Sequence, residues 1–177
     1  MIPVTANKQL MWIQGLLPEK IRKQITDLCI ANNDDLKLSD HFLIYPLHVS
    51  FKRSFYTDRF ETIREDLKEL LEGYGPIDCT SLFPMKVKDM IWLGFENEEE
   101  LLKIHERIDD NLLERYQIPV DEFDRNYHPH VTLFRDDDGE KLEEMLNRIR
   151  DHFPMEDVRI EEVIIGARGK EGCLYQL

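Results

Sequence analysis

The sequence predicts an α+β fold, with helices packed on the outside of one or two sheets. Strand-like and helix-like segments alternate along the 177 residues, a pattern that favours sheets covered by helices. The order helix, loop, histidine-containing strand, helix and strands also occurs twice. In addition, the strand-like pieces LHVSF and HPHVTLF each contain a histidine followed two residues later by a hydroxyl side chain. The duplication suggests two similar lobes, and we expect residues 1–177 to form a single domain.

The first half contains two predicted strands and two amphipathic helices. Residues 9–16 form a strand, and Pro18 opens a helix with four apolar positions at helical spacing. The polar segment 33–47 leads into the first histidine-containing strand. A capping box of Asp58 and Glu61 then begins a second helix, which ends in a glycine- and proline-rich turn. The apolar stripes of the two helices are Ile21, Ile25, Leu28 and Cys29, and Phe60, Ile63, Leu67, Leu70 and Leu71.

The second half repeats this order. A capping box of Asn97 and Glu100 begins a helix, and a loop around Pro119 then leads to the strand that contains His130. The other predicted elements are strands at 77–86, 89–95, 158–166 and 172–176 and a helix at 139–152.

Composition and charge limit the classes of partner. Hydrophobic residues make up 42% and charged residues 33% of the chain, which is typical of a globular protein. The formal net charge of -13 repels the backbone of a long nucleic acid, so we expect no long duplex nucleic acid as a partner. A small anionic substrate, or the end of an RNA, can still bind where positive charge and neutral donors are concentrated inside a cleft.

The cysteines and the apolar runs bear on the compartment. Cys29, Cys79 and Cys173 are widely spaced and odd in number, which suits neither a disulfide framework nor a paired metal site. The N-terminal sequence lacks the basic and apolar regions of a signal peptide, and no run approaches the roughly 20 apolar residues of a membrane span. We therefore expect a cytoplasmic protein with no membrane partner, and we expect it to be a monomer.

Four side chains of the repeated pattern suit metal-free phosphoester chemistry. Strand alternation puts His48 and Ser50 on one face, and likewise His130 and Thr132. If the two strands lie side by side, the imidazoles supply a general base and a general acid, and the hydroxyls hold the phosphate oxygens. An unperturbed imidazole pKa of about 6.5 makes both protonation states available near neutral pH. Paired histidines predict a bell-shaped pH profile, which we expect surrounding acidic residues to shift upward.

The pair LHVSF and HPHVTLFR resembles the signature motifs of the 2H phosphoesterase superfamily. More specifically, it is similar to the branch of bacterial 2′,5′-RNA ligase-like proteins, also described as RNA 2′,3′-cyclic phosphodiesterases. The segment MIWLGF with the amphipathic helix after it, and the ending IEEVIIGARGKEGCLYQL, resemble that branch in the same order. The resemblance covers most of the chain from about residue 9.

The resemblance implies a bilobal fold, in which antiparallel sheets of two pseudo-symmetric lobes line a central cleft and the helices lie outside. It implies that His48 and His130 are the acid/base pair, that Ser50 and Thr132 bind phosphate, and that no metal or other cofactor is required. It also implies an arginine beside the phosphate, here Arg135. The implied activity is phosphodiesterase action on 2′,3′-cyclic phosphate ends or 2′,5′ linkages of nucleotides or short RNA.

Three basic residues need separate consideration. Lys52 and Arg53 stand where family members often have a small residue and an aromatic one. Because Lys52 shares strand parity with His48, we consider it a further candidate for a phosphate contact. Simple alternation puts Arg135 on the opposite face from the second histidine, so it reaches the cleft only if the strand ends or bulges at Phe134.

Two alternative functions remain open. One is a non-catalytic protein of the same fold that binds RNA ends or nucleotides, which the acidic surface and the Lys52-Arg53 pair would favour. The other is a metal-dependent hydrolase with His128 and His130 as zinc ligands, although no third ligand stands at a familiar spacing. The remaining histidines lack a paired hydroxyl, and we expect the last two on helix surfaces: His41, His105 and His152. Several aromatic residues could stack a base but are more simply core or interface residues: Trp12, Tyr45, Phe55, Trp92 and Tyr127.

Overall fold

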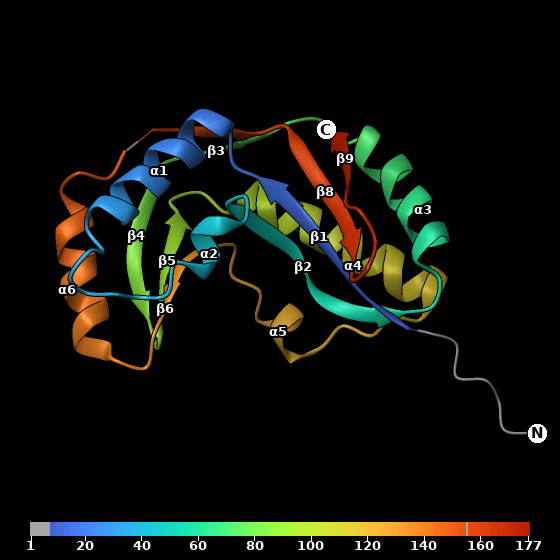
Figure 1. Cartoon of the computed structure of the whole chain (residues 1–177). Helices are drawn as coiled ribbons and strands as arrows, with labels where there is room; N and C mark the ends of the chain where they lie inside the picture. Colours follow the sequence, from blue (N-terminus) through green and yellow to red (C-terminus); the bar gives the residue numbers. More distant parts are fainter. Residues whose placement is uncertain (1–7, 155) are drawn as a thin grey trace, which may run out of the picture.

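Two antiparallel sheets form the framework of the protein (Figure 1) in the computed structural model, which describes residues 8–154 and 156–177. The larger sheet has the strand order β2-β1-β8-β9, and the smaller has the order β4-β5-β6. The strands of the larger sheet are β1 (Gln9–Leu16), β2 (His48–Thr57), β8 (Glu162–Ala167) and β9 (Cys173–Gln176). Those of the smaller sheet are β4 (Leu82–Val87), β5 (Met90–Phe95) and β6 (Val131–Arg135). A third, two-stranded pair consists of β3 (Ile77–Cys79) and β7 (Val158–Ile160).

The long helices lie on the outer faces of the two sheets (Figure 1). Helices α3 (Phe60–Glu72) and α4 (Glu99–Tyr116) pack against the larger sheet, where they contact β9 and β2. Helix α6 (Gly139–Arg150) packs on β4 of the smaller sheet, and Arg148 joins it to the end of α1 (Glu19–Ala31) by donating to the Asn32 carbonyl. Two short helices, α2 (His41–Ile44) and α5 (Glu122–Arg125), were not expected from the sequence. The predicted α+β fold of helices and antiparallel sheets is confirmed.

The chain crosses between the two sheets at the β3–β7 pair. The predicted strand 77–86 is in fact two strands, because the backbone turns at Ser81, where φ is 33°. The predicted strand 158–166 is likewise divided at Glu161 into β7 and β8. At the first break the chain passes to the smaller sheet, and at the second it passes to the larger one. The two crossings lie side by side in the β3–β7 pair, so both connections between the sheets run through the same part of the molecule.

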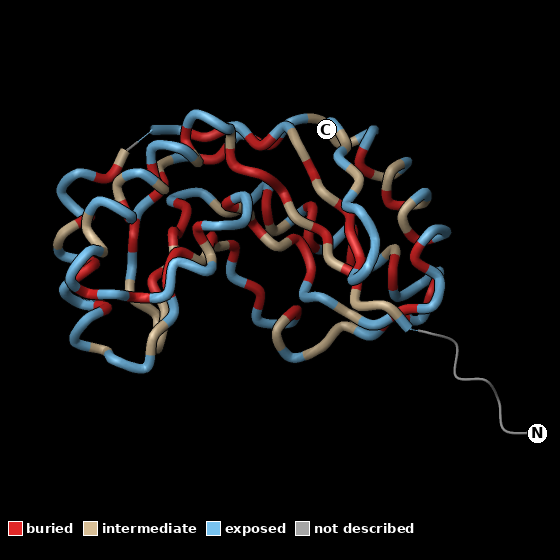
Figure 2. The backbone as a smooth tube through the Cα atoms, viewed as in Figure 1, coloured by how far each residue is buried: buried red, intermediate tan, exposed pale blue. Residues whose placement is uncertain are grey.

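The periodicity of the apolar residues explains where the core forms. Along β1 buried residues alternate with partly exposed ones (Figure 2), so that Met11, Ile13 and Gly15 face the helices while Trp12 and Gln14 face the other way. The apolar stripe of α3 is buried against the same side of the sheet, which removes it from water and stabilises the pairing of helix and sheet.

The helix starts differ from the predicted capping boxes. Helix α3 has Arg59 at its N-cap without a side-chain cap, and the Thr57 hydroxyl instead accepts from the Arg59 amide at 3.0 Å. Asn97 does accept from the Glu99 amide at 3.1 Å, but it lies one residue before the cap of α4. A true capping box is formed where none was predicted, at the start of α5. No helix within the described ranges is both long and apolar enough to cross a bilayer.

Candidate active site

Strand β2, which begins at His48, and strand β6, which begins one residue after His130, are edge strands of different sheets and lie next to each other. β2 is at one edge of the larger sheet, β6 is at one edge of the smaller sheet, and the two strands are in contact. A cavity of about 660 Å³ opens where they meet, and it is lined by His48, Ser50, His130 and Thr132. Its volume lies in the range of small-molecule sites, roughly 300–1,000 Å³. The fold therefore brings together the four side chains that the repeated motif suggests.

Strand alternation turns these four side chains into the cavity. In β2, Val49 is fully buried on the core side, while the residues before and after it are partly exposed. In β6, Val131 is buried in the same way and Thr132 is partly exposed. The apolar residues between the polar ones hold each strand against its helix layer, so the histidine and hydroxyl of each motif have a fixed direction.

Both imidazole rings are oriented by the same hydrogen bond. The Nδ1 of His48 lies 2.9 Å from the Pro46 carbonyl oxygen, and the Nδ1 of His130 lies 2.7 Å from the His128 carbonyl oxygen. A carbonyl oxygen can only accept, so Nδ1 carries the proton in each ring. The Nε2 atom is then the one available to take up or release a proton in the cavity.

Burial controls the charge of the two rings. Desolvation lowers the pKa of His48 below its ordinary value, against the opposite effect of the bond to the Pro46 carbonyl. Desolvation also lowers the pKa of His130, and the positive charges of His48 and His128 lower it further. No carboxylate contributes to either shift. The expected upward shift by acidic residues is therefore wrong, because the acidic residues lie elsewhere and burial dominates.

Aromatic rings form part of the wall of the cavity. Trp12 and Tyr45 line it, together with His41 and Phe42. Trp92 stacks on the ring of His130 with centroids 3.7 Å apart and planes 13° apart. The sequence indicates Trp12 and Tyr45 as residues that could stack a base, although core or interface positions are the simpler explanation. His41 carries no signal in the sequence, because its place depends on how the 33–47 segment folds over the cavity.

Lys52 does not line the cavity, which corrects the prediction that it contacts a phosphate. The register of β2 against β1 shifts at Phe51, where Ile13 is opposite Lys52 but Gln14 is opposite Ser50. This bulge reverses the alternation, and the Lys52 side chain, 2% exposed, points toward α4. Its Nζ lies between two carboxylates, so it neutralises acidic side chains rather than a substrate.

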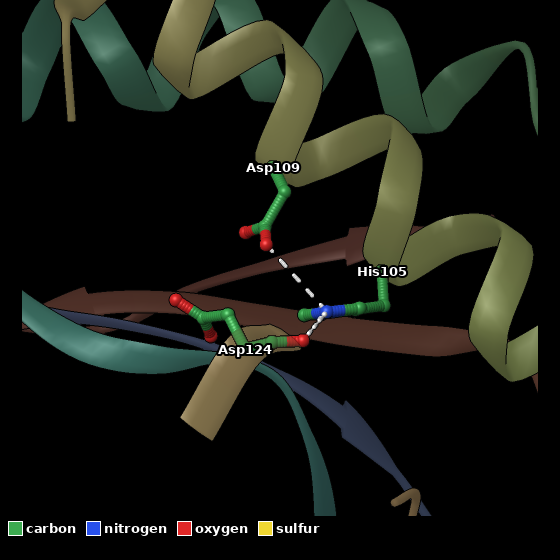
Figure 3. A group of neighbouring side chains, drawn as sticks. All are labelled: His105, Asp109 and Asp124. Carbon is green, nitrogen blue, oxygen red and sulfur yellow. Dashed lines mark hydrogen bonds and ion pairs between the residues drawn. The ribbon is translucent and has the colours of Figure 1, made fainter. Parts of the chain in front are cut away.

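The Lys52 ammonium is part of a buried charged cluster with His105, Asp109 and Asp124. Figure 3 shows the last three side chains, with His105 and Asp109 on α4 and Asp124 on α5. Nζ lies 2.5 Å from Asp124 Oδ2 and 2.7 Å from Asp109 Oδ1. The second contact is an ion pair between two side chains that are both almost fully buried. Burial raises the pKa of Asp109, and the ammonium opposes that effect. His105 is thus buried, contrary to the expected surface position.

The His105 ring is held between two backbone carbonyls. Its Nδ1 lies 2.8 Å from the Phe51 oxygen and its Nε2 lies 3.1 Å from the Asp124 oxygen. Both oxygens only accept hydrogen bonds, so the backbone fixes the orientation of the ring from two sides. Tyr127 stacks on the ring at 3.8 Å and donates to the Ser50 carbonyl at 2.9 Å.

The cluster also contains the one set of possible metal ligands among residues 8–154 and 156–177. One ligand atom each from His105, Asp109 and Asp124 lies within 4.8 Å of the others. The Lys52 ammonium already contacts both carboxylates and supplies the positive charge that a metal would bring. The residues therefore form an ion-pair network that does not fit a metal. His128 and His130, considered as zinc ligands from the sequence, belong to no such set in that part of the chain.

Arg135 lies outside the cavity lining, at the end of β6. The register of β5 and β6 shifts between Ile91 and Trp92, so a bulge is present near the predicted position. The bulge puts Arg135 on the same face of β6 as Thr132, which is the condition under which we predicted that Arg135 would reach the cleft. Its Nε nevertheless donates to Asp89 Oδ2 at 2.8 Å in the β4–β5 turn, and the side chain is exposed. The structure thus brings His48, Ser50, His130 and Thr132 together, but neither Lys52 nor Arg135 with them.

Comparisons with known proteins bear on the family and the fold of the chain. A sequence model described as the 2'-5' RNA ligase superfamily matches residues 17–172. No curated protein sequence matches the chain significantly. Among solved structures, E. coli LigT in complex with 3'-AMP is 17% identical to this chain and has a TM-score of 0.61. The alignment covers 97% of this chain and 96% of the LigT chain. Usb1 of Kluyveromyces marxianus is 14% identical, covers 99% and 100%, and has a TM-score of 0.56.

The sequence model matches most of the length of this chain. The chain therefore belongs to the 2'-5' RNA ligase superfamily, within the 2H phosphoesterases. The structural similarities are below 25% identity and show the shared fold. Membership supports a phosphodiesterase acting on RNA or nucleotides.

Proposed function

We propose that the protein is a metal-independent phosphodiesterase that opens 2′,3′-cyclic phosphate ends, or cleaves 2′,5′ linkages, in nucleotides or short RNA. The observation that carries this proposal is a single cavity lined by two imidazoles and two hydroxyls from two different sheets. Solved structures of E. coli LigT contain 3'-AMP or phosphate, which supports a nucleotide ligand for this fold.

The proposed reaction is an in-line displacement at phosphorus between His48 and His130. The Nε2 of one ring takes a proton from water while the water oxygen forms a bond to phosphorus. The bond from phosphorus to the ribose oxygen breaks, and the Nε2 of the other ring gives that oxygen a proton. The two rings then exchange protons with solvent before the next turnover. Acid and base are both supplied by side chains, so the step needs no metal-bound hydroxide.

Ser50 and Thr132 are proposed to hold the non-bridging phosphate oxygens. Each hydroxyl lies two residues beyond its histidine and faces the same cavity. A neutral hydroxyl donates a hydrogen bond to an anionic oxygen, and such bonds are stronger than neutral ones. The negative charge of the bound phosphate also favours the protonated form of the nearby ring, which supplies the acid.

Hydrolysis of nucleoside 2′,3′-cyclic phosphates in excess chelator tests the proposal. His48→Ala and His130→Ala should each lower kcat by about 10²- to 10⁴-fold, which is the usual contribution of a general acid or base. His152→Ala, an exposed histidine just beyond α6, is the matched control and should retain activity. Full turnover by both cavity variants would overturn the mechanism, and activity lost on chelation would favour a metal-dependent reaction.

A non-catalytic nucleotide-binding role makes a different prediction in the same assay. The wild-type protein would then bind cyclic and 2′,5′-linked substrates without turnover. Binding measured by calorimetry, alongside product analysis on the same samples, separates the two functions.

A further inference from the structure

On the cavity side of the larger sheet, strand β1 carries an aromatic side chain two residues from the position opposite Ser50. Trp12 and Gln14 lie on the same face of β1, and Gln14 is directly opposite Ser50 on β2. Two strand residues span roughly 7 Å, so the indole lies one step along the strand from the proposed phosphate site. A ribose can bridge that separation, which places the indole where the base of a nucleotide would lie.

The Trp12 ring lies against the backbone of the neighbouring strand. Gly166 on β8 is opposite Trp12 in the register, and a Cβ added there would be 2.5 to 2.7 Å from the ring atoms Nε1, Cε2 and Cζ2. These atoms belong to both rings of the indole, so the ring lies directly against the glycine. Only glycine leaves room for this contact. Trp12 also lines the cavity.

The composition of the lining fits the neutral part of a nucleotide. Although the net charge of the chain is -13, no carboxylate is among the described residues that line the cavity. On the side formed by the 33–47 segment and its end, His41, Phe42 and Tyr45 contribute further rings, and Tyr45 is 58% exposed. Aromatic faces stack on any nucleobase without requiring a particular sequence.

We propose that Trp12 is a stacking platform for the nucleobase of the substrate, held in place by Gly166. The inference rests on the proposed function, because the phosphate must lie between His48 and His130 for the base to reach Trp12. It assigns the ligand class as nucleosides carrying a phosphodiester on the ribose, rather than phosphodiesters in general. It also gives Gly166 a role in specificity, although that residue has no side chain to touch the substrate.

Two substrates that differ only in the base test the platform. Cytidine 2′,3′-cyclic phosphate carries the base, and methyl riboside 2′,3′-cyclic phosphate keeps the reacting ring but lacks the base. Trp12→Ala should lower kcat/KM for the cytidine substrate by about ten-fold or more and leave that for the base-free substrate within two-fold. Trp12→Phe should retain most of the activity on both. Equal losses on the two substrates, or no loss on either, would overturn the proposal.

Two further variants separate stacking from general damage to the sheet. Gly166→Ala should reproduce the selective loss, because the new methyl group displaces the indole. Tyr56→Ala removes an exposed aromatic residue from β2 of the same sheet, outside the cavity, and should change neither substrate. If Gly166→Ala lowers turnover of both substrates equally, Gly166 serves the sheet and not the platform.

A binding measurement distinguishes failure of this inference from failure of the proposed function. If the wild-type protein turns over neither substrate, the proposed function fails, but Trp12 fluorescence still reports on the base. Cytidine 2′-monophosphate should quench the wild-type emission, and ribose 5-phosphate at the same concentration should not. Quenching that is unchanged in Trp12→Phe would contradict the platform independently of catalysis.

Discussion

In the two halves of the site, His48 and His130 form the same hydrogen bond but have different neighbouring residues. In both halves Nδ1 bonds to the carbonyl oxygen two residues earlier, at 2.9 and 2.7 Å. Across the strand from the hydroxyl residue, however, stands Gln14 in the first half and Trp92 in the second. The similarity of the halves therefore extends to the reacting groups but not to the residues around them.

The strands that carry the two histidines are also held differently beyond the motif. β2 continues to Thr57 and buries Lys52 in a charged cluster, whereas β6 ends at Arg135, whose ion pair with Asp89 is exposed. Buried charges depend strongly on their partners, but exposed pairs contribute little. The comparison teaches that basic residues at similar but not identical places after the two motifs can have very different effects on stability.

Removal of the Lys52 charge should cause the largest effect, a loss in the free energy of unfolding. Lys52→Met leaves two buried carboxylates without a counter-ion, and breaking such a pair costs roughly 3–5 kcal/mol. Urea unfolding measures this loss of stability. Lys68→Met, which removes an exposed lysine from α3, is the matched control and should have little effect. Adding Asp124→Asn to Lys52→Met should recover part of the loss, and a Lys52→Met protein as stable as the wild type would show that the cluster is not ionic.

The two hydroxyls should contribute about equally if the phosphate is held symmetrically. Ser50→Ala and Thr132→Val each remove one donor to an anionic oxygen, a bond worth roughly 1.5–3 kcal/mol. We expect kcat/KM for a cyclic phosphate to fall by about ten- to hundred-fold in each variant. Ser54→Ala, an exposed serine of β2, should be neutral. A more than ten-fold difference between the two cavity variants would mean that one half holds the phosphate alone.

The pH profile of the wild-type protein should be bell-shaped and lie on the acid side. Activity falls at low pH when the base ring becomes protonated, and at high pH when the acid ring loses its proton. Burial lowers both pKa values in the free protein, so the maximum of kcat/KM should lie below pH ~6.5. The two limbs report the pair rather than individual rings. A maximum on the alkaline side would show that carboxylates control the rings after all.

Removal of Trp92 should change the pKa of His130 and leave the pKa of His48 unchanged. Trp92→Leu takes away the ring that covers His130, so water reaches the imidazole and its pKa should rise toward the ordinary value. No aromatic ring among the described residues stacks on His48, so the pKa of His48 should stay constant. NMR titration of the histidine ring protons measures both. Phe83→Leu, on β4 of the same sheet, is the control, and a parallel rise in both rings would mean that the variant opens the whole cavity.

The sequence predicts the repeated part of the site well and its surroundings poorly. Alternation alone orients His48 and Ser50, because one buried valine between them fixes the face of the strand. The position of Lys52 could not be obtained in the same way, since a one-residue bulge reverses every side chain that follows it. His41 and Trp12 reach the cavity through the path of a loop and through contact with Gly166, and both depend on residues far away in the sequence.

The smallest effect is expected for Arg135, which the family pattern puts beside the phosphate. Its guanidinium donates to Asp89 in the neighbouring turn and lies outside the cavity lining. Arg135→Ala should therefore change kcat/KM by less than about three-fold and hardly alter the melting temperature, because exposed pairs contribute little. Asp89→Ala provides the decisive comparison, since it frees the arginine without removing it. If Asp89→Ala raises kcat/KM and the raised value is lost again in the double variant, the guanidinium reaches the phosphate once it is released from Asp89.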